Sequence, residues 1–189
     1  ILDSGLLYRL YAFLSHLKIG IDDISEVITK DISFVVEDDS VHVIYEGNKI
    51  TNQLRSEDIA KIASEHSAKK EVRELLFDIQ RDFYNENGLV ADGRDMGTVV
   101  FKDAKIKIFL TASPEIRAKR RYLELQNRGQ EVNMPALIAD IEKRDLKDSS
   151  RELSPLFPAE DAHIIDSSKM SLEEVFSFTE NLIINEEFI

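Results

Sequence analysis

The chain has 189 residues, of which 43% are apolar, so it is long enough to bury the hydrophobic core of one ordinary domain. It contains no cysteine, which excludes disulfides, thiol catalysis and cysteine-ligated zinc. Its net charge of -12 argues against extensive binding to nucleic acid, because a strongly negative protein repels phosphates.

The N-terminal segment has none of the features of a signal peptide, and no apolar run approaches the length of a membrane span. We therefore expect a cytoplasmic protein with no membrane partner. The first residue is Ile1 rather than methionine, so we expect translation to begin upstream of it.

Helices are predicted at the start of the chain. Residues 1–17 open with Asp3, Ser4 and Gly5 and continue as an apolar run, which predicts a turn that leads into a helix. The run is rich in aromatic residues, which we expect in the core. A second, short helix is predicted at 22–30.

Residues 31–50 predict a small antiparallel β unit. Apolar residues occupy every second position at 32, 34 and 36 and again at 41, 43 and 45, as in strands with one buried face. Turn-forming residues at 38–40 and 46–48 separate the strands. We interpret the unit as an insertion, because it interrupts the alternation of strands and helices along the rest of the chain.

Helical periodicity returns at 55–67 and 69–87, and Gly88 ends the second of these helices. A short buried strand is predicted at 89–91 and another strand at 105–110.

Ser113 followed by Pro114 predicts the start of a helix that continues to about Asn127. The remaining predicted elements are a helix at 135–147, a strand at 162–166 and a helix from Ser171 to the C-terminus. Strands that alternate with helices indicate an α/β fold with a parallel sheet.

A first charged cluster follows the strand at 89–91. Asp92, Arg94 and Asp95 lie just beyond this strand, and ligands of open α/β sheets bind at the carboxyl ends of strands. Gly93 has no side chain, so a ligand could come close to the backbone at this position. The alternative is a tight turn that carries a surface salt bridge.

A second cluster has arginines on both sides of an acid. Arg144, Asp148 and Arg151 are spaced i, i+4 and i+7, which predicts that they share one helical face. Arginine binds phosphate oxygens two at a time, and a carboxylate accepts from ribose hydroxyls. The two clusters therefore suggest a pocket for a nucleoside monophosphate, with an exposed charge ladder as the alternative for the second.

Basic residues are also concentrated at 117–128, which indicates either a site for a small polyanion or a solvated helix face. They are Arg117, Lys119, Arg120, Arg121 and Arg128. The motif G-x-x-x-x-G-K-[ST] of phosphate-binding loops does not occur in the 189 residues.

Across the whole chain, these segments resemble bacterial cytidylate kinases in the same order. Residues 92–101, D-G-R-D-M-G-T-V-V-F, are the most specific part of the resemblance. It implies a P-loop-type three-layer α/β fold with a parallel central sheet, a small antiparallel β insertion and a helical lid.

The resemblance also implies a domain organisation. Residues 1–30 and 68–189 would form the core, with the lid at about 117–150 and the monophosphate-binding insertion at 31–67. A strand, phosphate loop and helix would precede Ile1. If the protein begins at Ile1, we expect binding of CMP without useful turnover.

Each group of residues takes a role by matching positions in that family. The residues that would read the cytosine ring are Ser4, Ser64, Arg73 and Asp95. Those that would hold the monophosphate are Arg9, Arg94 and Arg151, and those that would contact the ribose are Arg144 and Asp148. The implied catalytic residues are Arg94, Arg144 and Arg151.

The remaining implied roles concern ATP. Arg117, Arg120 and Arg121 would close over its phosphates from the lid. Asp92 would help to hold Mg²⁺, directly or through water. The implied activity is transfer of phosphate from MgATP to CMP or dCMP by a monomer that binds no nucleic acid. The alternatives are a related kinase that acts on UMP or AMP, and a non-catalytic nucleotide-binding fragment.

Overall fold

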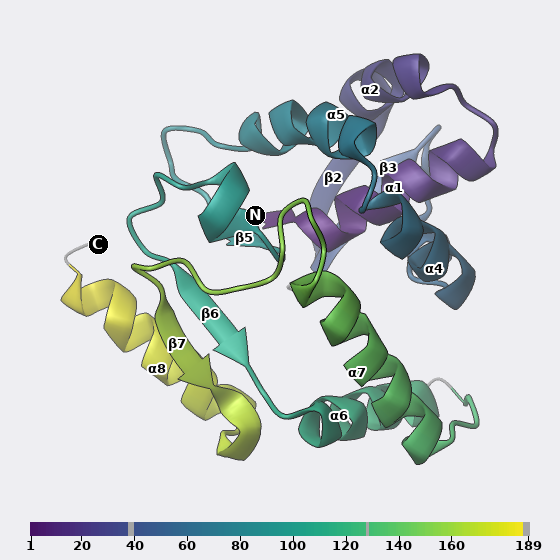
Figure 1. Ribbon diagram of the computed structural model, residues 1–189. Helices are drawn as coiled ribbons and strands as arrows, with labels where there is room; N and C mark the ends of the chain where they lie inside the picture. The colour runs from purple at the N-terminus through teal and green to yellow at the C-terminus, as the bar shows by residue number, and fades with distance from the viewer. Residues whose placement is uncertain (38–39, 128, 187–189) are drawn as a thin grey trace. The chain divides into compact units, whose positions relative to one another are not determined.

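The computed structural model describes residues 1–37, 40–127 and 129–186 (Figure 1). The expected turn at Asp38 and Asp39, Arg128 and the last three residues of the chain lie outside this description. The chain divides into two compact units, Ile1–Met96 and Gly97–Ile189.

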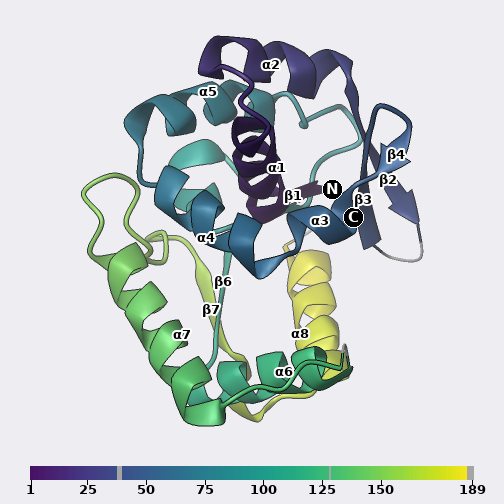
Figure 2. The same ribbon diagram turned by 90° about the vertical axis from the view of Figure 1, so that its right-hand side faces the viewer.

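Helix α1 (Ser4–His16) is the central element of the first unit, and Figure 2 shows the other helices of the unit around it. It begins at Ser4 because the Asp3 carboxylate accepts a hydrogen bond of 2.8 Å from the N–H of Leu6. Leu7, Leu10 and Leu14 are fully buried, and Tyr8 and Tyr11 are also core residues. The surrounding helices are α2 (Ile21–Lys30), α3 (Thr51–Leu54), α4 (Glu57–His66) and α5 (Lys70–Arg81).

The predicted β unit is confirmed. Its strands are β2 (Ile32–Glu37), β3 (Ser40–Tyr45) and β4 (Asn48–Lys49), which pair antiparallel in that order. Ile32 and Val43 place their side chains in the core of the first unit, as the alternation requires.

Strand β1 (Leu2–Asp3) pairs in parallel with β5 (Ala91–Asp92), so that Asp3 lies opposite Asp92. The sequence predicted a turn where β1 lies, because a strand of two residues is too short to show alternation. The prediction of a buried strand at 89–91 is wrong in its bounds, and Val90 is 72% exposed.

The second unit contains a parallel pair of strands, β6 (Ile108–Thr111) and β7 (His163–Asp166). Helices α6 (Pro114–Asn127) and α7 (Met134–Ser149) pack against each other (Figure 1). Helix α8 (Leu172–Asn185) begins with a capping box between Ser171 and Glu174.

The chain also forms two short helical turns, the π-helical turn η1 (Met96–Val100) and the 3₁₀ turn η2 (Ser167–Lys169). The sequence did not predict η1. The helix expected to continue to residue 87 ends at Arg81. In the described part of the chain, no helix has the length and apolar character needed to cross a membrane. Parallel strands, surrounding helices and a small antiparallel sheet confirm the predicted α/β class.

Candidate functional site

A buried ion pair joins α5 to the segment after β5. Arg73 donates a hydrogen bond from its guanidinium to the Asp95 carboxylate, and the two side chains are 12% and 6% exposed. The same guanidinium donates to the carbonyl of Ser67 at 3.0 Å and lies 5.9 Å from the centre of the Tyr8 ring. These contacts hold the donor groups of Arg73 beside the acceptor oxygens of Asp95. Such a pair can bind a ring that itself carries a hydrogen-bond donor and an acceptor.

Ser4 belongs to a second buried polar contact of the first unit. Its hydroxyl donates a 2.7 Å hydrogen bond to Oε1 of Gln80 on α5. We did not single out Gln80 from the sequence. The sequence did contain a sign of a buried polar contact, because Gln80 lies on the same face of the helix as Val72, Leu76 and Ile79, which are all buried.

Gly93 allows β1 and β5 to approach closely. A Cβ atom at Gly93 would lie 2.9 Å from the Cβ of Ser4 and 2.9 Å from the Cγ of Met96, closer than real side chains come. The close approach that the sequence predicted at Gly93 is therefore made by Ser4 and Met96 of the protein. It keeps the segment with Asp95 next to the start of α1.

The other residues predicted for the nucleotide in this unit lie on its helices and after β5. Arg9 donates to the carbonyl of Leu54 at 3.0 Å, which ties α1 to the end of α3. Ser64 lies on α4, and Arg94 precedes Asp95; both are half-buried. Their roles toward the nucleotide stay predictions.

Asp92 lies in an environment that favours the neutral form of its carboxyl. The Asp92 residue is solvent-exposed by surface area, yet nearby protein atoms remove part of the hydration of its carboxyl and raise its pKa. The negative charge of Asp3, its partner in the β1–β5 register, raises that pKa further. In the part of the chain that the structure describes, no group of three or more acidic or histidine side chains could hold a metal ion.

The second charged cluster gathers around Asp148, near the C-terminal end of α7. An Arg151 nitrogen lies 3.4 Å from Asp148 Oδ1, and Arg144 Nε lies 4.0 Å from Asp148 Oδ2. The side chains of Asp148 and Arg151 are 7% and 9% exposed, whereas that of Arg144 is 52% exposed.

The prediction that these three residues share one helical face is wrong for Arg151, because α7 ends at Ser149. The hydroxyls of Ser149 and Ser150 bond to the carbonyl of Leu146 at 3.2 and 2.6 Å, a local interaction typical of helix ends. The chain then turns back, and the N–H of Leu156 donates to the carbonyl of Asp148 at 2.9 Å. Arg151 therefore approaches Asp148 from a loop.

The basic residues of α6 bond to other parts of the second unit. Arg117 donates to both carboxylate oxygens of Asp145 on α7, with Nη1 2.8 Å from Oδ1, and this contact raises the pKa of Arg117. Arg120 donates to the carbonyl of Ser167 in η2 at 2.8 Å. Arg121 lies 2.8 Å from Glu124 on its own helix.

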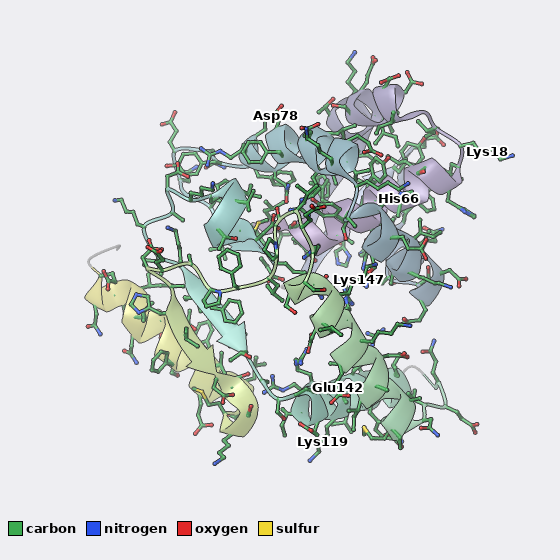
Figure 3. The ribbon with its side chains drawn as sticks, in the orientation of Figure 1. Lys18, His66, Asp78, Lys119, Glu142 and Lys147 are labelled. Carbon is green, nitrogen blue, oxygen red and sulfur yellow. The ribbon has the colours of Figure 1, made fainter. Side chains whose placement is uncertain are left out.

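Figure 3 labels Lys119 on α6, and Glu142 and Lys147 on α7. Through their bonds to Asp145 and Ser167, Arg117 and Arg120 connect α6 to α7 and to η2. The contact of these arginines with ATP stays a prediction.

Comparison with known proteins extends these observations. The family model for cytidylate kinase matches residues 1–184. The chain is 44% identical to the cytidylate kinase of Pasteurella multocida (strain Pm70) over 183 residues, which cover 94% of this chain and 80% of that protein. It is 48% identical to the cytidylate kinase of Pseudomonas aeruginosa (strain LESB58), over 93% of this chain and 80% of the relative.

Proposed function

The chain belongs to the cytidylate kinase family, and from this premise we propose that it transfers the γ-phosphoryl group of MgATP to CMP or dCMP. The products are CDP or dCDP and ADP. The observation in the structure that best supports this function is the buried Arg73–Asp95 pair, because its charges and burial suit recognition of a polar ring.

Cytosine carries an amino group beside ring acceptors. In the proposed complex, the Asp95 carboxylate accepts from the amino group, and Arg73 supplies donors to the ring. Uracil and thymine have a carbonyl oxygen in place of the amino group, so a carboxylate at that position repels them. The hydroxyls of Ser4 and Ser64 complete the proposed set for the base.

The monophosphate requires positive charge, because its oxygens and those of ATP repel each other. We assign this charge to Arg9, Arg94 and Arg151, and contact with the ribose to Arg144 and Asp148. A monophosphate oxygen attacks the γ-phosphorus, so no side chain acts as nucleophile. The arginines instead position the two nucleotides and stabilise the negative charge of the transition state.

Mg²⁺ would bind with the phosphates of ATP and neutralise part of their charge. Asp92 suits a role as its ligand, directly or through water, since Mg²⁺ in such sites takes one or two carboxylates and several waters or phosphate oxygens. Loss of hydration and, after it, the negative charge of Asp3 raise the pKa of Asp92, and a bound cation would relieve the repulsion between the two carboxylates. We assign Arg117, Arg120 and Arg121 to the lid that closes over ATP. We further propose that the enzyme is a monomer and that it acts in the cytoplasm.

The direct test is ATP-dependent phosphorylation of CMP and dCMP, with UMP and AMP as competing acceptors. Transfer that favours CMP supports the proposal. Preferred transfer to UMP or AMP would instead favour a related kinase, and binding of CMP with no transfer would favour a non-catalytic protein.

Arg151→Ala tests the phosphate role directly. We expect a loss of turnover of at least about a hundredfold, as for removal of a charged donor that stabilises a transition state. Lys143→Ala is the control, because it removes an exposed positive charge from α7, the helix that precedes Arg151. Equal rates for the two variants would remove Arg151 from the mechanism.

A further inference from the structure

Gln80 is a polar residue in an apolar environment. It is 2% exposed, on the stripe of α5 that also carries the fully buried Val72 and Leu76. Burial of an amide is unfavourable unless both of its ends are hydrogen-bonded. Both ends of Gln80 do have partners, so the contacts of this side chain define its orientation.

The orientation of the amide follows from the chemistry of these partners. Gln80 Nε2 lies 3.0 Å from the carbonyl oxygen of Leu76, and a carbonyl oxygen can only accept. The amino end of the amide must therefore face Leu76, and Oε1 must face Ser4. Since Oε1 also only accepts, the Ser4 hydroxyl donates its single proton in this 2.7 Å contact.

The consequence for Ser4 is that its hydroxyl has only lone pairs left. Among the described residues, the contact with Gln80 is the one hydrogen bond of this oxygen. Ser4 follows β1 and Asp95 follows β5, and the two strands are parallel with Asp3 opposite Asp92. Both residues therefore lie at the carboxyl end of this strand pair, where each offers an acceptor.

We propose that Gln80 is a positioning residue for base selection: it holds the Ser4 hydroxyl as an acceptor toward the nucleotide and so favours a base that carries an amino group. The inference rests on the proposed function. An amino group has two protons, which can be donated to Asp95 and to Ser4. A carbonyl oxygen at the same place would face two acceptors and no donor.

Replacement of Gln80 by methionine tests this proposal, because methionine keeps the length of the side chain but has no amide. In Gln80→Met, the Ser4 hydroxyl is free to turn and donate to the carbonyl oxygen of UMP. We expect the ratio of CMP affinity to UMP affinity, measured by calorimetric titration, to fall roughly five- to tenfold, the effect of about one hydrogen bond. In Gln80→Glu we expect the buried acid to be protonated, so that its O–H replaces the amide N–H toward the Leu76 carbonyl and its other oxygen still accepts from Ser4; this variant should retain the ratio of the wild type.

Ser4→Ala provides the second arm of the experiment. If Gln80 acts through Ser4, then Gln80→Met has no further effect on the ratio in a Ser4→Ala background. Ile24→Val is the stability control, since it removes one methyl group from a fully buried residue of the same unit. Thermal unfolding of each variant separates loss of selectivity from loss of structure, and Gln80→Leu replaces Gln80→Met if the latter does not fold.

The possible outcomes are distinct. A lower ratio in Gln80→Met, with a retained ratio in Gln80→Glu and Ile24→Val, supports the role of Gln80. An unchanged ratio in folded Gln80→Met or in Ser4→Ala overturns it and leaves the proposed phosphoryl transfer intact; in the case of Ser4→Ala it also removes Ser4 from the residues proposed to read the base. A wild-type protein without preference for CMP overturns both.

Discussion

At the scale of single residues, the contact between Arg73 and Asp95 shows how a charge becomes part of a specific site. Both side chains are nearly buried, so each charge depends on the other for the interactions it loses with water. Tyr8 and the Ser67 carbonyl restrict the guanidinium further. The residue pattern after a predicted strand singled out Asp95, whereas Arg73 was identified only through the resemblance, and neither predicted the contact between them, because they are 22 positions apart.

Asp95→Asn should affect both base selection and stability. We expect the preference for CMP over UMP to decrease, because an amide can donate to the carbonyl of uracil, whereas a carboxylate repels it. The free energy of unfolding should fall by about 3 kcal/mol, since Arg73 loses a buried ionic partner. Competitive phosphorylation assays and urea unfolding measure the two effects.

Asp78→Asn is the matched control, because Asp78 is an exposed acid of α5 (Figure 3). This substitution should change the free energy of unfolding by less than about 0.5 kcal/mol and leave base preference unchanged. If Asp95→Asn behaved like Asp78→Asn, the base would be read by other residues.

Asp92 predicts a dependence of stability on pH. Its pKa in the folded protein is raised above the ordinary value of 3.8, so the folded state binds the proton more tightly than the unfolded chain. This contribution is fully present below pH 3.8 and is lost as the pH rises through the raised pKa. Asp92→Asn should therefore increase the melting temperature at pH 7 by about 1 to 2 °C, and the difference should disappear in acid.

Asp161→Asn should show the opposite trend. Its carboxylate accepts from Lys107 at 2.7 Å, which lowers the pKa of Asp161, so its contribution is present above pH 3.8 and is lost as the pH falls through the lowered pKa. Thermal unfolding between pH 3 and pH 7.5 compares both variants with the wild type. Parallel pH profiles for Asp92→Asn and the wild type would show that Asp92 ionises normally.

At the scale of elements, α6 carries arginines that the sequence assigned to ATP and that the structure joins to neighbouring segments. Arg117 bonds to Asp145 of α7 and to the carbonyl of Ala112, and Arg120 bonds to Ser167. The order of residues could not predict these contacts, because they depend on how α6 and α7 pack. An arginine with a protein partner can still exchange it for a phosphate, so the two roles are compatible.

Arg117→Ala should weaken the packing of α6 on α7. We expect the free energy of unfolding to fall by about 1 kcal/mol, since a paired side chain that is 35% exposed contributes less than a buried one. Arg121→Ala removes an arginine whose pair with Glu124 lies within one helix, and such i,i+3 pairs contribute little, so it should cost less than about 0.5 kcal/mol. Chemical unfolding measures both, and equal values would show that the contact with Asp145 adds no stability.

At the scale of the whole molecule, a net charge of -12 coexists with concentrated arginines. In the described residues, these arginines face acids and carbonyls of the protein, as Arg73 and Arg117 do. Because the net charge is negative, the long-range electrostatic field of the protein is negative, even though arginine side chains supply positive charge at single sites.

This charge predicts that the protein does not bind RNA. We expect no retention of single-stranded RNA in filter-binding assays at about 0.15 M salt, whereas CMP binds under the same conditions. Retention that weakens steeply as salt increases would contradict the prediction and indicate a phosphate-binding surface on the protein.

The sequence by itself determined features that depend on neighbouring residues. Alternation at 31–50 predicted the antiparallel β unit, and Ser113 with Pro114 predicted the start of α6, because strand period and helix caps are local properties. The segment 92–101 was specific enough to indicate the family.

Only the tertiary structure decided which polar groups meet. Ser4 and Gln80 are 76 residues apart, and their hydrogen bond depends on how α5 packs beside the start of α1. Arg151 leaves the helical face that its spacing predicted, because α7 ends two residues earlier and the chain turns back. Such contacts arise from packing between distant segments, which gives a side chain its partner and thus the direction of its hydrogen bond.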